Sequence, residues 1–485
     1  MDYQFGVSVN WFGHVEGSLD PMSLIAPIQF NQTDLSRFSN VTVVGLGVTG
    51  YSVVRYFSSQ GRSVNVVDTR SEPSMAANLR ADYPQVKSYY GDLNCEAVLG
   101  ADLLVVSPGV SLRAPALLAA KYNGAVIIGD VEIFLKVNQA PLIAITGSNG
   151  KSTVTSLVGE ICRAAGMTPL VAGNIGKPVL DAITDQENYN LAVLELSSFQ
   201  LETTRSVPAE SAAILNISED HMDRYDSMGD YVLAKAKILR GANRAILPRH
   251  DERLEQITNA NDVLSFGLDQ PLNGSEYGVV REKSGRWLMQ GRERIMKLRD
   301  VPLTGMHNVL NVLSALALTD FLKLPQGRVI EAIKSFGGLP HRMQTVIKAS
   351  GITWVNDSKA TNVGATKTAL QSLEGNLIWI AGGEGKGADF DELKEAVGPS
   401  MKMAILFGSD AKAIADSIAE LAPISHVATM KEACELAYKK ARDGDVVLLS
   451  PACASFDMFR DFEHRGQSFV DAVLSLVNGK AEVEV

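Results

Sequence analysis

The chain has 485 residues, which is enough for about three domains that each have a core of their own. Hydrophobic residues make up 46% and charged residues 21%, as in ordinary globular proteins, and the net charge of −10 argues against broad binding to nucleic acids or anionic membranes. The four cysteines form no CxxC pair, and no apolar run approaches the roughly 18 residues that span a bilayer. We therefore expect a cytoplasmic protein without disulfides, a zinc site or a membrane span.

Residues 1–38 mix glycine, asparagine, serine and aromatic residues without clear periodicity, and none before Arg37 is basic. A signal peptide would need a charged start, so we do not expect one here. We expect a flexible, disordered extension, or a start codon placed too early, with Met22 as a candidate true start.

The first α/β unit, expected over residues 39–137, opens with a strand at 41–44 and the run GLGVTG at 45–50. A second strand, 64–68, ends at Asp68, so the spacing is that of a dinucleotide-binding turn with an acid for a ribose. One interpretation is NAD binding. The other is a Rossmann-like domain that uses the same crevice for a different nucleotide, with the Asp68-Thr69-Arg70 triplet and Ser107 at strand ends.

The second unit, expected over residues 138–338, contains a buried strand at 142–145, a glycine turn and a helix that opens at Lys151. Such a turn directs backbone N–H groups and a helix N-terminus at one point, which favours a polyphosphate. Lys151 would contact the outer phosphates and Ser152 would ligate Mg²⁺. The full Walker pattern requires a glycine where Ile145 stands, so the loop is a shortened relative; a purely structural turn is the alternative.

Two polar clusters follow later strands of this unit. Glu195 ends an otherwise apolar strand, and because an unpaired buried carboxylate is costly, Mg²⁺ is its simplest partner. The alternative is an edge position that caps a loop. His221 lies beside Asp220 and Asp223, which favours a role near a metal ion over a satisfied core imidazole.

Two helices of the second unit carry further candidates. In the helix at 231–239, Lys235 and Lys237 cannot share a face, so one of them should point inward. In the helix at 305–317, Asn308 and Asn311 lie three residues apart on one face, where they could contact a nucleotide or simply pack.

The third α/β unit, expected over residues 339–485, has strands at 352–356, 376–380, 403–407 and 445–450. Three of these strands end in dense polar sequence. Ligands of open α/β sheets gather beyond the carboxyl ends of the strands, so these residues could line one cleft; each could also be a solvated loop residue. The candidates here are Lys359, Thr361, Lys386 and Ser455.

The motifs together resemble the Mur ligases, the ATP-dependent enzymes that add amino acids to peptidoglycan precursors. The matching runs extend from about residue 40 to the C-terminus in the family's order: GLGVTG at 45–50, SPG at 107–109, TGSNGKST at 146–153, ELSSFQLE at 195–202, EDHMDR at 219–224, LPHR at 339–342, NDSKATN at 356–362 and SPACAS at 450–455. The Ser-Asn pair of the phosphate loop and the SFQLE run resemble the members that add D-glutamate. The chain departs from the pattern in its N-terminal segment and at Phe456 and Met458, which puts amino-acid affinity in doubt but not the reaction type.

The resemblance implies three domains: a Rossmann-like N-terminal domain, a central P-loop ATPase-like domain with a mostly parallel sheet, and a Rossmann-like C-terminal domain. It implies a monomeric, cytoplasmic ligase of cell-wall biogenesis, cell shape and cell division that joins D-glutamate to UDP-N-acetylmuramoyl-L-alanine through an acyl phosphate. The implied ligase uses ATP and two Mg²⁺ ions, and its Lys235 is N-carbamylated.

Residue by residue, the resemblance implies four sets of contacts. The reaction would use Lys151, Asn174, Glu195, His221 and Lys235, with metal ligands among Ser152, Glu195, His221 and Lys235. ATP would contact Gly147, Ser148, Asn149, Gly150, Lys151, Ser152, Thr153, Asn308, Asn311, Arg342 and Asp357. The UDP-linked substrate would contact Gly45, Leu46, Gly47, Thr49, Gly50, Asp68, Thr69, Arg70 and Ser107. D-glutamate would contact Lys359, Thr361, Lys386, Ser455 and Phe456.

Three other functions are compatible with parts of the sequence. A nicotinamide dehydrogenase would use the 45–68 fingerprint but would leave the phosphate loop and Glu195 unexplained. A non-catalytic nucleotide switch would bind ATP without amino-acid-dependent turnover. A folylpolyglutamate synthase-like ligase would be expected to carry Gly-Lys-Gly where this chain has Gly150-Lys151-Ser152.

Overall fold

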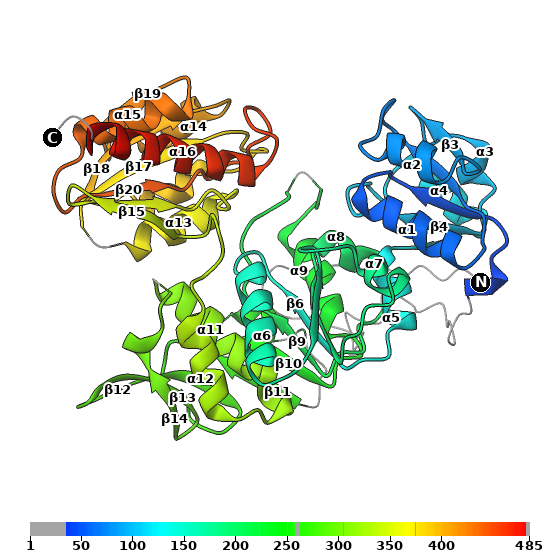
Figure 1. The fold of residues 1–485 in the computed structure, drawn as a ribbon, viewed down its shortest axis with the longest axis horizontal. Helices are drawn as coiled ribbons and strands as arrows, with labels where there is room; N and C mark the ends of the chain where they lie inside the picture. Colours follow the sequence, from blue (N-terminus) through cyan, green and yellow to red (C-terminus); the bar gives the residue numbers. More distant parts are fainter. Residues whose placement is uncertain are drawn as a thin grey trace, which may run out of the picture. The chain divides into compact units, whose positions relative to one another are not determined.

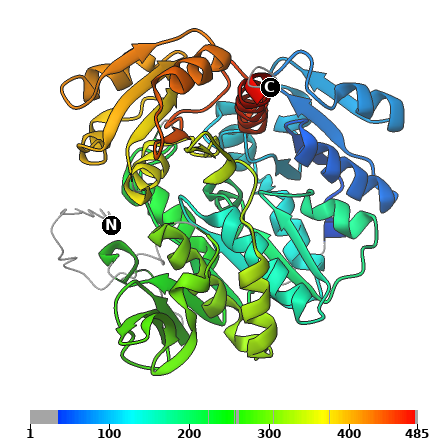
Figure 2. The ribbon, with the colours of Figure 1, turned by 60° about the vertical axis from the view of Figure 1, so that its left-hand side comes forward.

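The computed structural model describes residues 35–481 except positions 223, 250, 256, 258–261, 304 and 374, with side chains described up to residue 477. The expected extension over residues 1–38 therefore falls mainly on residues 1–34, outside the described part, as does Met22. The stretch from Asn40 onwards is one compact unit. Its described strands form three sheets, and each sheet is built from one continuous stretch of chain (Figures 1 and 2).

The first sheet has five parallel strands in the order β3-β2-β1-β4-β5, in which β1 is central. This order places the turn after β1 at the point where the chain reverses its winding direction, which is where open α/β sheets bind ligands. Its elements are β1 Val41–Val44, α1 Val48–Ser59, β2 Asn65–Asp68, α2 Ala76–Asp82, β3 Lys87–Tyr90, α3 Glu96–Leu99, β4 Leu103–Val106, α4 Pro115–Tyr122 and β5 Val126–Ile128. The short 3-10 helix Leu35–Arg37 precedes them.

The central sheet has nine strands in the order β14-β13-β12-β11-β10-β9-β6-β8-β7. It is parallel from β7 to β12 and antiparallel from β12 to β14. The core packs α6, α11 and α12 against the sheet. Its elements are α5 Asp130–Val137, β6 Leu142–Thr146, α6 Lys151–Ala164, β7 Pro169–Gly173, α7 Val179–Thr184, β8 Leu191–Glu195, α8 Ser198–Glu202, β9 Ser211–Ile214, α9 Met228–Ala236, β10 Arg244–Pro248, α10 Glu252–Glu255, β11 Asp262–Phe266, β12 Glu276–Glu282, β13 Gly285–Gln290, β14 Glu293–Lys297, α11 Met306–Thr319 and α12 Gln326–Ser335, with 3-10 turns at Lys237–Leu239, Leu298–Asp300 and Asp320–Leu322.

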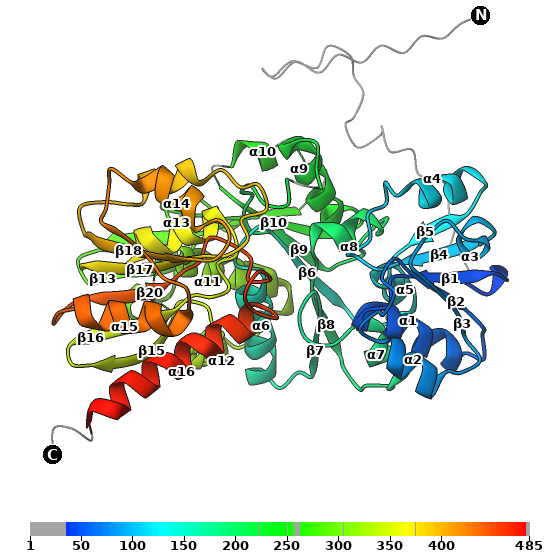
Figure 3. The same ribbon diagram turned by 90° about the horizontal axis from the view of Figure 1, so that it is seen from above.

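The third sheet has six strands in the order β15-β16-β20-β17-β18-β19, and β15 is its antiparallel edge. Its central strands are buried on both faces. Trp379 and Leu406 pack under α13 and α14, while the neighbouring Ile380 and Phe407 pack under α15 and α16, which lie side by side (Figures 1 and 3). Burial on both faces explains the continuous apolar runs. The elements are β15 Gln344–Ala349, β16 Ile352–Asn356, α13 Val363–Ser372, β17 Leu377–Gly382, the 3-10 helix Phe390–Glu395, β18 Met401–Phe407, α14 Ala411–Ile418, β19 Ile424–His426, α15 Met430–Lys440, β20 Val446–Leu449 and α16 Phe462–Ala481.

The expected fold class, α/β with three mostly parallel sheets, is confirmed. Within the part of the chain that the structure describes, no helix is long and apolar enough to cross a membrane.

Candidate active site

The central glycine loop joins β6 to the N-terminus of α6. Gly150 precedes the helix with φ of +82°, a conformation that favours glycine, and a Cβ there would lie 2.5 Å from Oδ1 of Asn311. The 14-residue helix α6 then begins at Lys151. Its unpaired N–H groups and positive dipole end fit a phosphate at this loop.

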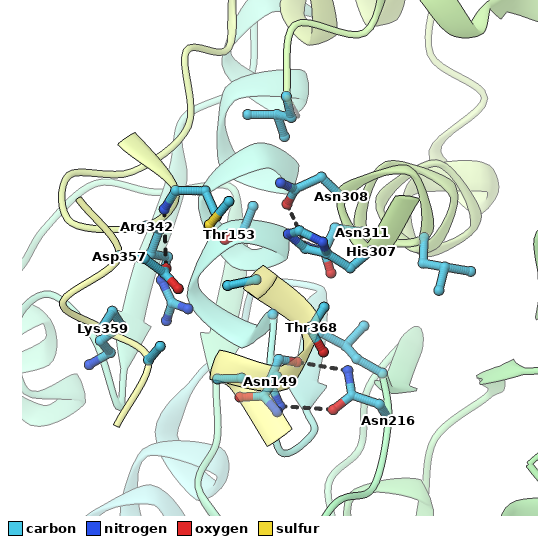
Figure 4. Close-up of a pocket in the computed structure, with 18 of the residues that line it drawn as sticks. Asn149, Thr153, Asn216, His307, Asn308, Asn311, Arg342, Asp357, Lys359 and Thr368 are labelled. Atoms are coloured by element: carbon cyan, nitrogen blue, oxygen red, sulfur yellow. Dashed lines mark hydrogen bonds between the residues drawn. The ribbon is translucent and has the colours of Figure 1, made fainter. Parts of the chain in front are cut away.

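Side chains from other loops hold the glycine loop in place. The Asn149 N–H donates to Oδ1 of Asn216 (2.8 Å), and Nδ2 of Asn216 donates to the Asn149 carbonyl (3.0 Å), as Figure 4 shows. The Ser148 hydroxyl donates to the Ser218 carbonyl (2.9 Å) and lies 3.1 Å from the Tyr231 hydroxyl. These bonds fix the position of the loop between β6 and α6.

Two lysine ammonium groups meet at this loop. Nζ of Lys151 donates to the carbonyls of Gly147 and Ser148, both at 2.7 Å, and Nζ of Lys235 donates to the Gly147 carbonyl at 2.8 Å. Lys235 is only 1% exposed, and burial together with the Lys151 charge lowers its pKa well below the ordinary value. Burial also lowers the pKa of Lys151. Both shifts disfavour positive charge at this loop, and a bound anion would offset them.

Of the two lysines near the end of α9, it is Lys235 that points fully inward. Lys237 begins the following 3-10 turn and is half-buried, and its Nζ donates to the Glu202 carbonyl at 2.8 Å. Burial lowers its pKa to about 8. One inward lysine was expected, and the second is partly withdrawn from water as well.

Glu195 ends β8 and is 1% exposed, so it does not lie at an exposed edge. Its Oε1 accepts a hydrogen bond from Nδ2 of Asn174 (2.8 Å), while its Oε2 is buried without a partner among the described residues. An unpartnered buried carboxylate oxygen is costly and fits a cation ligand. No three described His, Cys, Asp or Glu side chains are arranged to hold a metal ion, so an ion here would also need hydroxyl, phosphate or carbamate oxygens.

His221 lies in the loop between β9 and α9 with φ of +59°. Its Nε2 is 3.6 Å from Oδ2 of Asp220, and its ring centroid is 4.7 Å from that of Phe199. Asp223, the other acid that the sequence places beside it, lies outside the described residues. The imidazole is thus held between a carboxylate and an aromatic ring at the edge of a cavity that it shares with Lys235.

A first cavity of about 380 Å³ opens beside the glycine loop (Figure 4). It is lined by Asn149, Gly150, Thr153, Asn308, Asn311, Arg342 and Asp357 from the predicted ATP set. Nδ2 of Asn311 donates to Oδ1 of Asn308 (3.0 Å), and Nη2 of Arg342 donates to the Ser152 hydroxyl (2.9 Å). Gly147, Ser148, Lys151 and Ser152 are not among its lining residues.

Asp357 belongs to this first cavity and is 7% exposed. Burial raises its pKa to about 7, although the carboxylate accepts hydrogen bonds from the Ser450 hydroxyl (2.9 Å) and from the Met343 N–H (3.1 Å, Figure 4). It is therefore about half protonated near neutral pH.

A second cavity of about 480 Å³ brings together residues from two different sheets. The central domain contributes Lys151, Asn174, His221 and Lys235, and the C-terminal domain contributes the five predicted D-glutamate contacts, Lys359, Thr361, Lys386, Ser455 and Phe456. Lys359 also lines the first cavity, and burial followed by the Arg342 charge lowers its pKa to about 8. This lysine therefore connects the two cavities.

The predicted UDP-substrate residues form a separate cluster at the turn after β1, and none of them lines either cavity. A Cβ on Gly50 would lie 1.9 Å from the Gly45 carbonyl oxygen, so only glycine permits this turn. Asp68 Oδ2 accepts from the Leu46 N–H (2.6 Å) and from Nη2 of Arg70 (2.7 Å). Burial alone would raise the pKa of Asp68, but these bonds hold it below the ordinary value.

The other members of this cluster surround the turn. The Ser107 hydroxyl donates to the Gly45 carbonyl (2.9 Å), Gly47 and Thr49 are half-buried at the start of α1, and Thr69 is exposed beside Arg70. Pro108 is the nearest residue in sequence that reaches the second cavity.

Sequence reasoning missed several residues that line the cavities. Asn216, His307, Met343 and Thr368 line the first, and Ser197, Ser198, Phe199, Asp461, Phe462 and Glu463 line the second. The charged run at 460–465, which extends into the first turn of α16, follows a strand-end cluster and was a usable signal. No local sequence signal marks His307 and Met343, because only tertiary packing brings them to the first cavity.

Comparison with known proteins agrees with this geometry. Three family models match: the Mur ligase MurD-like N-terminal domain over residues 39–129, the Mur ligase middle domain over 145–319 and the Mur ligase glutamate ligase domain over 341–453. A protein of Pseudomonas aeruginosa named UDP-N-acetylmuramoylalanine–D-glutamate ligase is 46% identical over 94% of this chain and 100% of its own. The chain belongs to the Mur ligase family.

Other relatives support the assignment to the Mur ligases. A protein of the same name from Methylobacillus flagellatus is 45% identical over 90% of this chain and 97% of its own length. Among solved structures, the UDP-N-acetylmuramate-alanine ligase of Thermotoga maritima aligns with a TM-score of 0.56 at 21% identity, over 90% of this chain and 99% of that one. This likeness supports the Mur ligase fold.

Proposed function

We propose that the protein is an ATP-dependent ligase that joins D-glutamate to UDP-N-acetylmuramoyl-L-alanine and releases ADP and phosphate, in peptidoglycan precursor synthesis. The observation that carries the proposal is the second cavity, in which the phosphate-loop lysine Lys151 meets five C-terminal residues and Asn174, whose side chain bonds the buried Glu195 behind the lining. The near-full-length identity to relatives of that name supports the substrate assignment. One such ligase accounts for both glycine loops, whereas a dehydrogenase would use only the first.

In this proposal ATP occupies the first cavity and its phosphates reach the N-terminus of α6. Asn308 and Asn311 would contact the nucleoside, and Arg342, which already bonds the Ser152 hydroxyl, would contact the phosphates. Lys151 would exchange its bonds to loop carbonyls for the outer phosphates, because a charge-assisted bond to phosphate is stronger than one to a neutral carbonyl. The residues that we propose to contact ATP are the same as those predicted from the sequence.

The proposed reaction has two chemical steps, phosphoryl transfer and amide formation. A carboxylate oxygen of UDP-N-acetylmuramoyl-L-alanine attacks the γ-phosphorus, and the bond from that phosphorus to the ADP oxygen breaks. The amine nitrogen of D-glutamate then attacks the acyl carbon, loses a proton, and phosphate leaves with the acyl–oxygen bond electrons. Lys151 and Asn174 would stabilise charge on the transferring phosphoryl group.

Magnesium fits the donor set at this site. Bound Mg²⁺ would neutralise phosphate charge, and the residues that would hold two ions are Ser152, Glu195, His221 and Lys235 as a carbamate. The unpartnered Oε2 of Glu195 supports one position. The second ion position would be formed by His221 and Lys235, which both line the second cavity.

Carbamylation of Lys235 is supported by its burial. The 1% exposure of Lys235 and its strongly lowered pKa favour the neutral amine, which is the form that attacks carbon dioxide. The nitrogen of the neutral amine forms a bond to the carbon and loses a proton, so a buried amine becomes an anionic carbamate. That change would remove the repulsion between Lys235 and Lys151 and supply an oxygen ligand.

We further propose that the UDP moiety binds the turn at residues 45–50 with Asp68, Thr69, Arg70 and Ser107, and that the enzyme works as a cytoplasmic monomer. We also propose that the three domains span residues 39–137, 138–338 and 339–485. In the same proposal Lys359, Thr361, Lys386, Ser455 and Phe456 hold D-glutamate.

Product analysis tests the proposal directly. The protein is incubated with Mg-ATP, UDP-N-acetylmuramoyl-L-alanine and D-glutamate, and the uridine-containing products are examined by mass spectrometry. We expect a new species heavier by one glutamyl residue, formed only when all three substrates are present. If the protein binds ATP in a separate titration but does not form this species, the nucleotide switch is favoured. In a parallel incubation with a folate in place of the UDP-linked substrate, a glutamylated folate would favour the folylpolyglutamate synthase-like activity.

A further inference from the structure

Arg224 is a side chain without an assigned role that contacts both the N-terminal and the central domain. Its Nη1 donates to the Pro108 carbonyl (2.9 Å) and its Nη2 donates to the Val110 carbonyl (3.3 Å). The same Nη2 also bonds Oε2 of Glu202 at 2.7 Å. With its side chain only 14% exposed, this guanidinium joins three elements that are distant in sequence.

One end of this connection reaches the loop predicted to bind the UDP-linked substrate. Pro108 and Val110 follow β4, and the Val110 N–H donates to the Ser107 carbonyl (3.0 Å). The Ser107 hydroxyl in turn donates to the Gly45 carbonyl (2.9 Å). Three successive hydrogen bonds thus lead from Arg224 through Val110 and Ser107 to Gly45 in the glycine turn of the first domain.

The other end reaches the His221 loop. The Arg224 N–H donates to the His221 carbonyl (2.9 Å), and the guanidinium lies 4.0 Å from the centroid of the Phe199 ring, which also contacts the His221 ring. Glu202 fastens the arrangement, because its Oε1 accepts from the Tyr225 hydroxyl at 2.6 Å. A cation stacked on a ring and bonded to a carboxylate has one well-defined position.

We propose that Arg224 is a positioning residue that couples the UDP-substrate loop of the first domain to the His221 loop of the second cavity, which is the reactive cavity of the proposed function. This inference rests on the proposed function for its substrates. Both loops border one cavity through Pro108 and His221, so their spacing decides where the end of the UDP-linked substrate meets the phosphoryl group. A misplacement of about 1 Å in such a geometry can cost about 100-fold in rate.

A simpler interpretation is that Arg224 only holds two domains together, and Arg55 provides the matched control for it. Arg55 of α1 bonds Asp181 and, at 2.8 Å, Asp185, so it also joins the first domain to the central domain. It does not line the reactive cavity. Loss of Arg55 should therefore lower stability without moving the two loops relative to each other.

The kinetic test compares the parent, Arg224→Ala, Arg224→Lys and Arg55→Ala, each corrected for its folded fraction. We expect Arg224→Ala to lower kcat about 100-fold while the Kd for UDP, whose proposed contacts do not include Arg224, stays within about twofold. Lysine has no fork that could bond Glu202 and two carbonyls together, so Arg224→Lys should recover only part of kcat. Arg55→Ala should keep kcat.

An exchange measurement tests the coupling without turnover, so it separates this inference from the proposed function. In the parent, UDP should slow amide hydrogen exchange both at residues 44–50 and at residues 219–226. In Arg224→Ala, we expect slowing at residues 44–50 only. Turnover failure in the parent would contradict the proposed function alone. Equal slowing of residues 219–226 in parent and variant, no slowing there in the parent, or equal kcat losses in Arg224→Ala and Arg55→Ala would overturn the coupling.

Discussion

The two glycine turns of this protein solve different problems with similar sequences. At the turn after β1, each charged group has its partner: Asp68 accepts from Arg70 and from the Leu46 N–H, and Ser107 donates to the Gly45 carbonyl. At the turn after β6, two lysines share the Gly147 carbonyl, and Oε2 of Glu195 has no partner among the described residues. The first turn is electrostatically satisfied before a ligand arrives and the second is not.

This difference indicates that the turn after β1 suits substrate binding and that the turn after β6 suits the chemical step. A satisfied site changes little when ligand leaves, and it suits uniform binding that affects KM. A site with unbalanced buried charge gains most when phosphate and metal arrive, and its groups suit stabilisation of the transferring phosphoryl group. Substitutions in the two turns test this division.

Lys235→Ala should reduce turnover by about a thousandfold or more, because it removes the proposed carbamate ligand from the unsatisfied turn. Added short carboxylic acids should restore part of the activity by supplying the missing carboxylate. Phosphate release measures both, and Lys237→Ala is the matched control since that lysine lies outside both cavities. Full activity of Lys235→Ala would contradict the role of this lysine.

Glu195→Gln should lower kcat by about 100-fold and yet raise the melting temperature measured without ligands. The amide keeps the shape and an acceptor for Asn174, while the buried negative charge with its unpartnered oxygen disappears. Calorimetry and phosphate release on the same sample provide the two values. A lower melting temperature in the variant would show that the charge is already satisfied.

Asp68→Asn should raise the KM for the UDP-linked substrate by about tenfold and leave kcat within about twofold, because this carboxylate organises the binding turn only. Initial rates over a substrate series separate the two constants. If kcat fell as strongly as for Glu195→Gln, the division between the two turns would be wrong.

Asp357→Asn should remove a pH dependence of stability. The pKa of Asp357 is raised by burial to about 7, so the folded protein holds this carboxyl neutral below that pH and loses the associated stability as pH rises through 7. The melting temperature of the variant relative to the parent should therefore be higher at pH 8 than at pH 6, by a few degrees. An equal difference at both pH values would contradict the raised pKa.

Much of this architecture follows from local sequence because polar residues interrupt apolar strands at their carboxyl ends. Glu195, Lys359 and Ser455 were found in that way, and the structure places Glu195 at the end of β8 and the other two in the segments that follow β16 and β20. The strands over 262–297 and the edge strand β15 are among those that were missed. They carry no functional cluster, and β15 has a half-exposed pattern without a continuous apolar run.

What the sequence could not provide is how the three sheets share one site. Nothing local places Pro108 beside His221, or Lys359 on both cavities. These contacts depend on packing between segments that lie more than a hundred residues apart, and no periodicity or spacing reports them. The bonds of Arg224 to the carbonyls of Pro108 and Val110 belong to the same class.

The most direct test of the account is phosphate release from Mg-ATP in the presence of UDP-N-acetylmuramoyl-L-alanine, with D-glutamate, L-glutamate, L-alanine, diaminopimelate or no amino acid added. The account predicts release with D-glutamate and background levels with the other four. Release with a different amino acid would keep the ligase chemistry and contradict the assigned substrate. No release with any of them, from protein shown to be folded, would contradict the ligase itself.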